Sequence, residues 1–195
     1  MTKTRQHSAR ARGFTLIELL IVVIILAILA AIVVPQFANT TVDAKEATLD
    51  SNLSTVRAAI EQYKVQHSVY PAAVAATGTG AAVACGTGGV VGTGAIDTSQ
   101  ALIDQLTLAS DKNGHTCSLA DPVNYKFGPY IRGKLPNEPI NEIGSLPAAI
   151  TTTNTGAKLT ATVATGGWAY DDKSGEFIMR SNAADSKGTT KYFEH

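Results

Sequence analysis

The chain has 195 residues, 45% of them apolar, with sixteen basic and sixteen acidic residues. This length accommodates one modest domain besides a membrane segment, and the even charge balance argues against a nucleic-acid-binding protein. Four of the basic residues lie in the first thirteen positions without any acid, which leaves twelve basic residues against sixteen acidic ones in the remainder.

The first segments in chain order are a basic leader, residues 1–13, and an apolar run, residues 14–34. A positive flank before an apolar segment indicates the end that stays in the cytoplasm. The run has Thr15 and Glu18 as its only polar members, and at about 1.5 Å per residue it reaches roughly 30 Å, enough to cross a bilayer core.

A secretory signal peptide has its small-residue cleavage site after the apolar region, whereas here Gly13 precedes it. A cut there would leave the apolar helix on the mature chain. The basic residues of the leader are Lys3, Arg5, Arg10 and Arg12.

Glu18 is a carboxylate near the start of this apolar run. A charged side chain within a bilayer costs roughly 2.5 to 3.5 kcal/mol on insertion scales and marks a functional partner, although an acid near the headgroups could also snorkel to the interface. After a cut at Gly13, the new ammonium group of Phe14 would lie one helical turn from Glu18. By itself, a glycine before a helix is better interpreted as a simple linker.

The residues GFTLIE, positions 13–18, together with the apolar run, resemble the N-terminal signal of type IV pilins and of type II secretion pseudopilins. The resemblance implies cleavage after Gly13 by the membrane prepilin peptidase, N-methylation of Phe14, and polymerisation with identical subunits into a helical filament with the apolar helices at its centre. It also implies that Glu18 meets the Phe14 ammonium of a neighbouring subunit, which neutralises both charges and fixes the axial register.

Pro35 lies about six turns into the helix, where its missing N–H and its ring predict a kink or a locally opened turn. A plain helix end is the alternative. Residues 35–70 predict an amphipathic continuation that stops at Tyr70-Pro71. Such a stripe indicates that this half of the helix packs on a globular domain. The stripe consists of Leu49, Leu53, Val56, Ile60 and Tyr63.

Residues 71–195 are expected to form that domain, which gives an α+β fold: a long N-terminal helix on a small antiparallel sheet. Residues 72–96 are rich in Gly, Ala and Thr and predict a surface loop. Cap-type residues 97–99 precede a short predicted helix with an apolar face of Leu102, Ile103 and Leu106. The proline-rich residues 128–147 predict an ordered loop.

The sheet is expected near the end of the chain. Residues 158–165 alternate at period two, and residues 166–182 contain two β-type runs joined by a turn. The expected sheet-core anchors are Trp168, Tyr170, Phe177 and Ile178.

The segments LPNEPINE and GGWAYDDKSGEF are similar to the C-terminal region of pseudopilins of the general-secretion type, where a proline loop precedes a hairpin with an aromatic strand. Major subunits of that family often bind calcium in a C-terminal loop, and no other cofactor is expected. Four hairpin residues carry the hard oxygens that calcium needs, but they also fit a plain turn. These residues are Asp171, Asp172, Ser174 and Glu176.

The two cysteines, Cys85 and Cys117, would form a disulfide in an exported domain. Closing a loop of about 33 residues stabilises by roughly 3 to 4 kcal/mol in the chain-entropy model. Two free buried thiols are the alternative. The four histidines lack the paired spacing of a zinc site and no nucleophile-elbow motif is present, so no enzymatic activity is expected.

The sequence thus predicts a filament subunit, most similar to a major type II secretion pseudopilin that drives protein export. The polar Gly/Thr loops favour the alternative, a type IV pilin that forms a surface fibre for adhesion, twitching motility or DNA uptake. Expected partners are identical subunits, the prepilin peptidase, an inner-membrane assembly platform, and minor pilins or pseudopilins, with no direct nucleic-acid partner. The chain is expected to cross the inner membrane once, with its N-terminus cytoplasmic before cleavage and its C-terminal domain periplasmic, or to be assembled in a periplasmic or surface filament.

Overall fold

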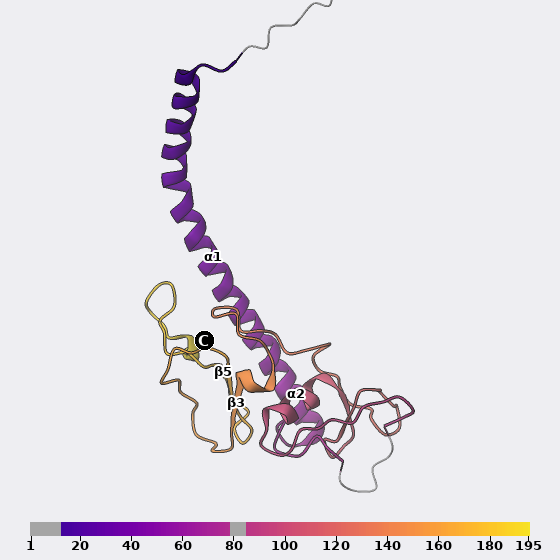
Figure 1. The fold of residues 1–195 in the computed structure, drawn as a ribbon. Coiled ribbons are helices and arrows are strands. Elements are labelled where there is room, and N and C mark those ends of the chain that lie inside the picture. The colour runs from indigo at the N-terminus through magenta and orange to yellow at the C-terminus, as the bar shows by residue number, and fades with distance from the viewer. Residues whose placement is uncertain (1–12, 79–84) are drawn as a thin grey trace, which may run out of the picture. The chain divides into compact units, whose positions relative to one another are not determined.

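The computed structural model describes residues 13–78 and 85–195 (Figure 1), so all but the last residue of the expected leader lies outside the described residues. The chain divides into two compact units, Met1–Thr41 and Val42–His195. Helix α1 (Leu16–His67) begins in the first unit and ends in the second. The fold is α+β, with this long helix followed by a small β-sheet domain, as expected.

In the first unit, α1 runs through Pro35 without interruption. The alternative in which Pro35 ends the helix is therefore wrong, and the kink at Pro35 stays a prediction. In the second unit, α1 ends at His67, slightly before the expected stop at Tyr70-Pro71. Ser68 adopts a positive φ of 63° while its N–H donates to the Lys64 carbonyl (2.7 Å), which closes the last turn.

The core of the second unit is built on the predicted helix stripe, whose five residues are all buried. Helix α2 (Ser99–Thr107) begins at its N-cap Thr98, whose hydroxyl accepts from the Ala101 N–H, and it packs Leu102 and Leu106 into the same core. Figure 1 shows α2 and strands β3 and β5 beside this part of α1. The core residues from the sheet are Ile150, Trp168, Tyr170, Phe177 and Met179.

Two small sheets complete the unit. Strands β1 (Ala109–Ser110) and β2 (Thr116–Cys117) pair antiparallel. The larger sheet has the order β3-β4-β5, in which β4 (Trp168–Asp171) is central. Strand β3 (Ile150–Thr153) runs parallel to β4 and β5 (Phe177–Met179) runs antiparallel to it. Two short 3-10 helices are η1 (Pro147–Ala149) and η2 (Tyr192–Glu194).

The sheet prediction was right about the hairpin and wrong about its neighbour. Strands β4 and β5 form the expected hairpin, and the four expected anchors are buried. Residues 158–165 form no strand, because only Ala161 among them is buried and a strand there would have no apolar face to cover. The third strand is β3, and since it pairs parallel to β4 the sheet is mixed rather than antiparallel.

The surface-loop prediction for 72–96 needs correction in its described part, because Ala72, Ala76, Gly92 and Gly94 are buried. A Cβ on Gly94 would overlap the backbone of α2 at Ala101, so only glycine permits this approach.

Buried polar side chains replace strand pairing in this loop-rich unit. Asp104 on α2 accepts from the N–H groups of Thr93 (2.8 Å) and Gly94 (2.9 Å). Glu138, in the proline-rich loop, accepts from the Asn141 N–H (3.0 Å). The contact with Gly94 satisfies a backbone donor that would otherwise be buried without a partner.

Candidate functional site

The expected cleavage position lies in non-helical chain before α1. A Cβ added to Gly13 would meet nothing within 4 Å, and Phe14 is 87% exposed. The peptide bond between the two residues is thus open to an approaching enzyme, with no side chain on its N-terminal residue.

Thr15 and Glu18 form a reciprocal capping box at the start of α1. The backbone N–H and the hydroxyl of Thr15 both donate to Glu18 Oε2 (2.9 and 2.8 Å), and the Glu18 N–H approaches Thr15 Oγ1 (3.2 Å). This arrangement pairs otherwise unsatisfied donors of the first turn and holds the carboxylate where the helix dipole favours negative charge. Sequence reasoning missed this role of Thr15, although the Thr-x-x-Glu pattern is a recognised signal for it.

The remainder of the first unit presents apolar side chains on all faces of α1. Large apolar residues from Phe14 to Val34 are all exposed within the unit. By its length and composition, α1 is long and apolar enough to cross a membrane. A helix that is apolar all round needs lipid or other apolar helices around it.

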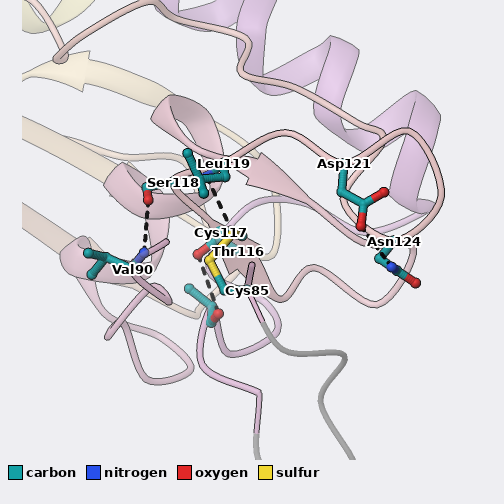
Figure 2. Close-up of a disulfide and its surroundings, with 9 residues drawn as sticks. Cys85, Val90, Thr116, Cys117, Ser118, Leu119, Asp121 and Asn124 are labelled. Carbon is teal, nitrogen blue, oxygen red and sulfur yellow. Dashed lines mark hydrogen bonds between the residues drawn. A yellow bond between two sulfur atoms is a disulfide. The ribbon is translucent and has the colours of Figure 1, made fainter. Parts of the chain in front are cut away.

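Cys85 and Cys117 are joined by a disulfide, with Cα atoms 5.5 Å apart (Figure 2). Cys117 is fully buried in β2 and pairs with Val91 through an isolated bridge. Around the disulfide, the Val90 N–H donates to Ser118 Oγ (2.9 Å) and the Ser118 N–H donates to the Val90 carbonyl (2.9 Å). The bond therefore fastens the middle of the Gly/Ala/Thr segment to strand β2.

The four hairpin residues considered for calcium do not act as one ligand set. Asp171 accepts from the N–H groups of Thr155 (2.8 Å) and Ser174 (2.8 Å), among others, and these hydrogen bonds hold the pKa of its carboxyl well below its usual range despite burial. Ser174 Oγ accepts from the Glu176 N–H (3.3 Å), and the Glu176 carboxylate accepts from the Leu159 N–H. The turn interpretation accounts for these three residues.

Asp172 differs from its three neighbours, because its buried carboxylate accepts no hydrogen bond from the described residues. Within the described residues, no group of three or more His, Cys, Asp or Glu side chains could hold a metal ion. The four residues therefore do not fit a calcium site as a set.

Comparison with known proteins bears on the N-terminal segment. Residues 8–34 match the family model described as the prokaryotic N-terminal methylation motif. Over 59 residues the chain is 44% identical to the type II secretion system core protein G of Pseudomonas aeruginosa, covering 30% of this chain and 42% of that protein. Over 62 residues it is 47% identical to the type IV narrow pilus major component PilA5 of Thermus thermophilus, covering 32% of this chain and 53% of that protein.

A third relative, core protein G of Vibrio cholerae, is 37% identical over 71 residues, covering 36% of this chain and 46% of that protein. The chain thus spans about half the length of the curated relatives it matches, or less. No solved structure matches the chain. The N-terminal segment carries the signature shared by type IV pilins and type II secretion pseudopilins, as the sequence predicted. The expected similarity of the C-terminal region stays a prediction.

Proposed function

We propose that this chain is a structural subunit of a pilus-like filament rather than an enzyme, and that the filament is the pseudopilus of a type II secretion system. The observation that carries the proposal is an apolar helix exposed on all faces, with an open Gly13–Phe14 bond before it and Glu18 in its first turn. Prepilin peptidase cuts after Gly13 and methylates Phe14. The functional segments are the leader 1–13, the membrane and polymerisation helix 14–34, its amphipathic continuation 35–70, and the exported domain 71–195.

Glu18 then acts as the assembly charge. In the described part of the chain, the hydrogen bonds to its carboxylate all fall on Oε2, which leaves Oε1 for a donor from another subunit. The Phe14 ammonium of a neighbouring subunit supplies that donor and the counter-charge. A buried acid is strongly destabilising without such a partner, so a subunit in the wrong axial register is rejected.

Two sets of variants test processing and assembly separately. Gly13→Leu places a bulky side chain at the cut and should leave the full-length precursor in the inner membrane, whereas Gly13→Ala should still be cut. Glu18→Gln keeps the shape and an acceptor for Thr15 but removes the charge, so membrane insertion should persist while filaments are lost. Mature protein from Gly13→Leu, or normal filament levels from Glu18→Gln, would contradict the proposal.

The choice of a pseudopilin over a pilin is supported by the relatives named as secretion core protein G, which come from several genera. The alternative, a type IV pilin that forms a surface fibre, is favoured by the pilus component of Thermus thermophilus. Electron microscopy of sheared surface material from cells with native expression separates them. Long external fibres of this chain would make it a pilin. Protein confined to the envelope, with loss of an exported protein on deletion, is the expected result.

The proposed partners follow from the filament role. They are identical subunits, the prepilin peptidase, the inner-membrane assembly platform, and minor pilins or pseudopilins. Before assembly, the subunit is a single-pass inner-membrane protein with its C-terminal domain in the periplasm.

A further inference from the structure

In the second unit, α1 carries two different structures on opposite flanks, a projecting turn near the end of the chain and a groove beside the proline-rich loop. Each structure contacts its own set of helix residues, spaced three and four apart. At about 100° per residue, the two sets point in directions roughly 160° apart. The set toward the C-terminal segment is Asp43, Glu46 and Asp50, and the set toward the groove is Lys45, Thr48 and Asn52.

The C-terminal turn, residues 184–191, is fastened at its base and exposed at its tip. The Asp185 N–H donates to the Thr190 carbonyl (2.8 Å), which closes the turn. Ser186 anchors the turn to α1, because its N–H and its hydroxyl donate to the two carboxylate oxygens of Glu46 (2.6 and 2.7 Å). The tip, which begins at Ser186, is exposed, and in Figure 1 the turn is the yellow loop that stands out from the unit. The turn is therefore a fixed projection on one flank of α1.

The groove lies between α1 and the proline-rich loop on the other flank. The Lys45 ammonium pairs with the Glu142 carboxylate (2.7 Å), and the Asn52 amide donates to the Asn137 carbonyl (3.2 Å), so the loop is tied to the helix at two points. A cavity of about 650 Å³, a size typical of binding clefts, is lined by residues of both segments. Lys134 is an exposed part of this lining and forms no ion pair within the described residues.

The charges of the turn and of the groove are complementary. The turn carries Asp185 and, two residues later, Lys187, and neither forms an ion pair within the described residues. The groove offers a cation, Lys134, and a carboxylate, Glu142, whose side chain is 75% exposed. If the turn entered the groove, Asp185 would meet Lys134 while Lys187 met Glu142. Such a pattern favours one orientation of the turn over the reverse one.

Between the two flanks, α1 presents an exposed face of small residues. Ala44, Ala47, Ser51 and Thr55 are exposed on this face, and the Thr55 hydroxyl donates to the Ser51 carbonyl (2.8 Å), so its polar group is already paired. Short side chains allow another molecule to approach the helix closely. Since α1 itself separates the turn from the groove, a chain cannot insert the turn into its own groove. A second copy of the chain is the occupant that carries the matching turn.

We propose that the C-terminal turn of one subunit inserts into the groove between α1 and the proline-rich loop of the next subunit. This contact rests on the proposed filament function and assigns the two surfaces through which the exported domains meet. Because the two surfaces differ, the contact is heterologous: each copy offers a turn to one neighbour and a groove to another. Such a contact repeats from copy to copy, and it builds a helical filament when the rotation does not close.

Cysteine cross-linking of the full chain in filaments tests the contact. Lys187→Cys on the turn is combined with Asn137→Cys, at an exposed groove residue, and a short bis-maleimide reagent is added. The native cysteines are bonded to each other and do not react with it. We expect a ladder of linked dimers, trimers and larger species from the double variant, and only monomers from each single variant. The matched control combines Lys187→Cys with Lys112→Cys, which is exposed but outside the groove, and should give no ladder.

A charge exchange between turn and groove gives a second, independent measurement. Lys187→Glu alone should lower the amount of filament by about fivefold or more, because two carboxylates then face each other across the contact. Adding Glu142→Lys to the same chain should restore the filaments, because opposite charges meet again. A fault in the folding of the turn would not be repaired by a change in the groove.

Two results would overturn the proposed contact while leaving the filament function intact. One is normal filaments in which the turn and groove cysteines give no ladder, or no more than the control pair. The other is a Glu142→Lys change that fails to restore filaments to Lys187→Glu. If the native chain forms no filaments at all, the filament function is refuted and this contact is refuted with it.

Discussion

Replacing Gln105 by leucine tests how strongly buried side-chain hydrogen bonds hold the second unit together. Gln105 is fully buried on α2. Its Oε1 accepts from the Ala72 N–H (2.6 Å), and its Nε2 donates to the carbonyls of Val74 and Gly114 (3.0 Å each). Leucine has a similar volume but leaves these three backbone groups without partners.

The expected loss follows from those three groups. A buried polar group that loses its partner costs about 1 to 3 kcal/mol, and small backbone shifts relieve part of this, so Gln105→Leu should lower the free energy of unfolding by about 3 to 5 kcal/mol. That is a large part of the roughly 5 to 15 kcal/mol available to a domain.

Urea unfolding of the full chain in detergent, followed by the fluorescence of the single tryptophan, measures this loss. Trp168 is buried in the central strand and reports on the second unit. The matched control is Gln62→Leu at an exposed position of α1, which should change stability by less than about 0.5 kcal/mol. A loss below about 1 kcal/mol for Gln105→Leu, or equal losses for both variants, would refute the reasoning.

The remaining predictions concern the disulfide and the two hairpin aspartates. Reducing the Cys85–Cys117 bond should lower the free energy of unfolding by roughly 3 to 4 kcal/mol. Urea unfolding with and without reductant measures this loss, and an unchanged midpoint would contradict a stabilising role for the bond. Since the pKa of Asp171 is lowered in the folded chain, its stabilisation is complete above about pH 4 and is lost as the pH falls further. In Asp171→Asn, the free energy of unfolding should therefore fall less steeply below about pH 4 than in the native chain. A variant whose free energy of unfolding falls with the same slope as that of the native chain, only from a lower value, would contradict this. The raised pKa of Asp172 acts in the opposite direction: its contribution to stability is complete while its carboxyl is protonated in both states, and it is lost as the pH rises from about 4 to about 7. Melting curves between pH 4.5 and 8 should show this loss, and Asp172→Asn should remove it.

Patterns that depend on local periodicity were readable from the sequence. The stripe from Leu49 to Tyr63 is buried because a helix repeats every 3.6 residues and the domain covers one face. The β4–β5 hairpin was also readable, because its two β-type runs are joined by a short turn whose residues favour turning.

Features that depend on distant contacts were not readable. Strand β3 is four residues long and pairs in parallel with β4, so no local turn marks it. The hydrogen bonds of Gln105 depend on two stretches of chain, around Ala72 and Val74 and at Gly114, which only the tertiary fold brings to α2. At the N-terminal site, the capping box of Thr15 and Glu18 was within reach of sequence reasoning, since its pattern is local.

The measurement that tests the central claim most directly is mass spectrometry of the N-terminal peptide of this chain, taken from filaments or envelope material at native expression. The filament-subunit account predicts a peptide that begins with N-methylated Phe14 and retains the whole apolar helix. A chain that keeps residues 1–13, or one that begins after the apolar run, would contradict it.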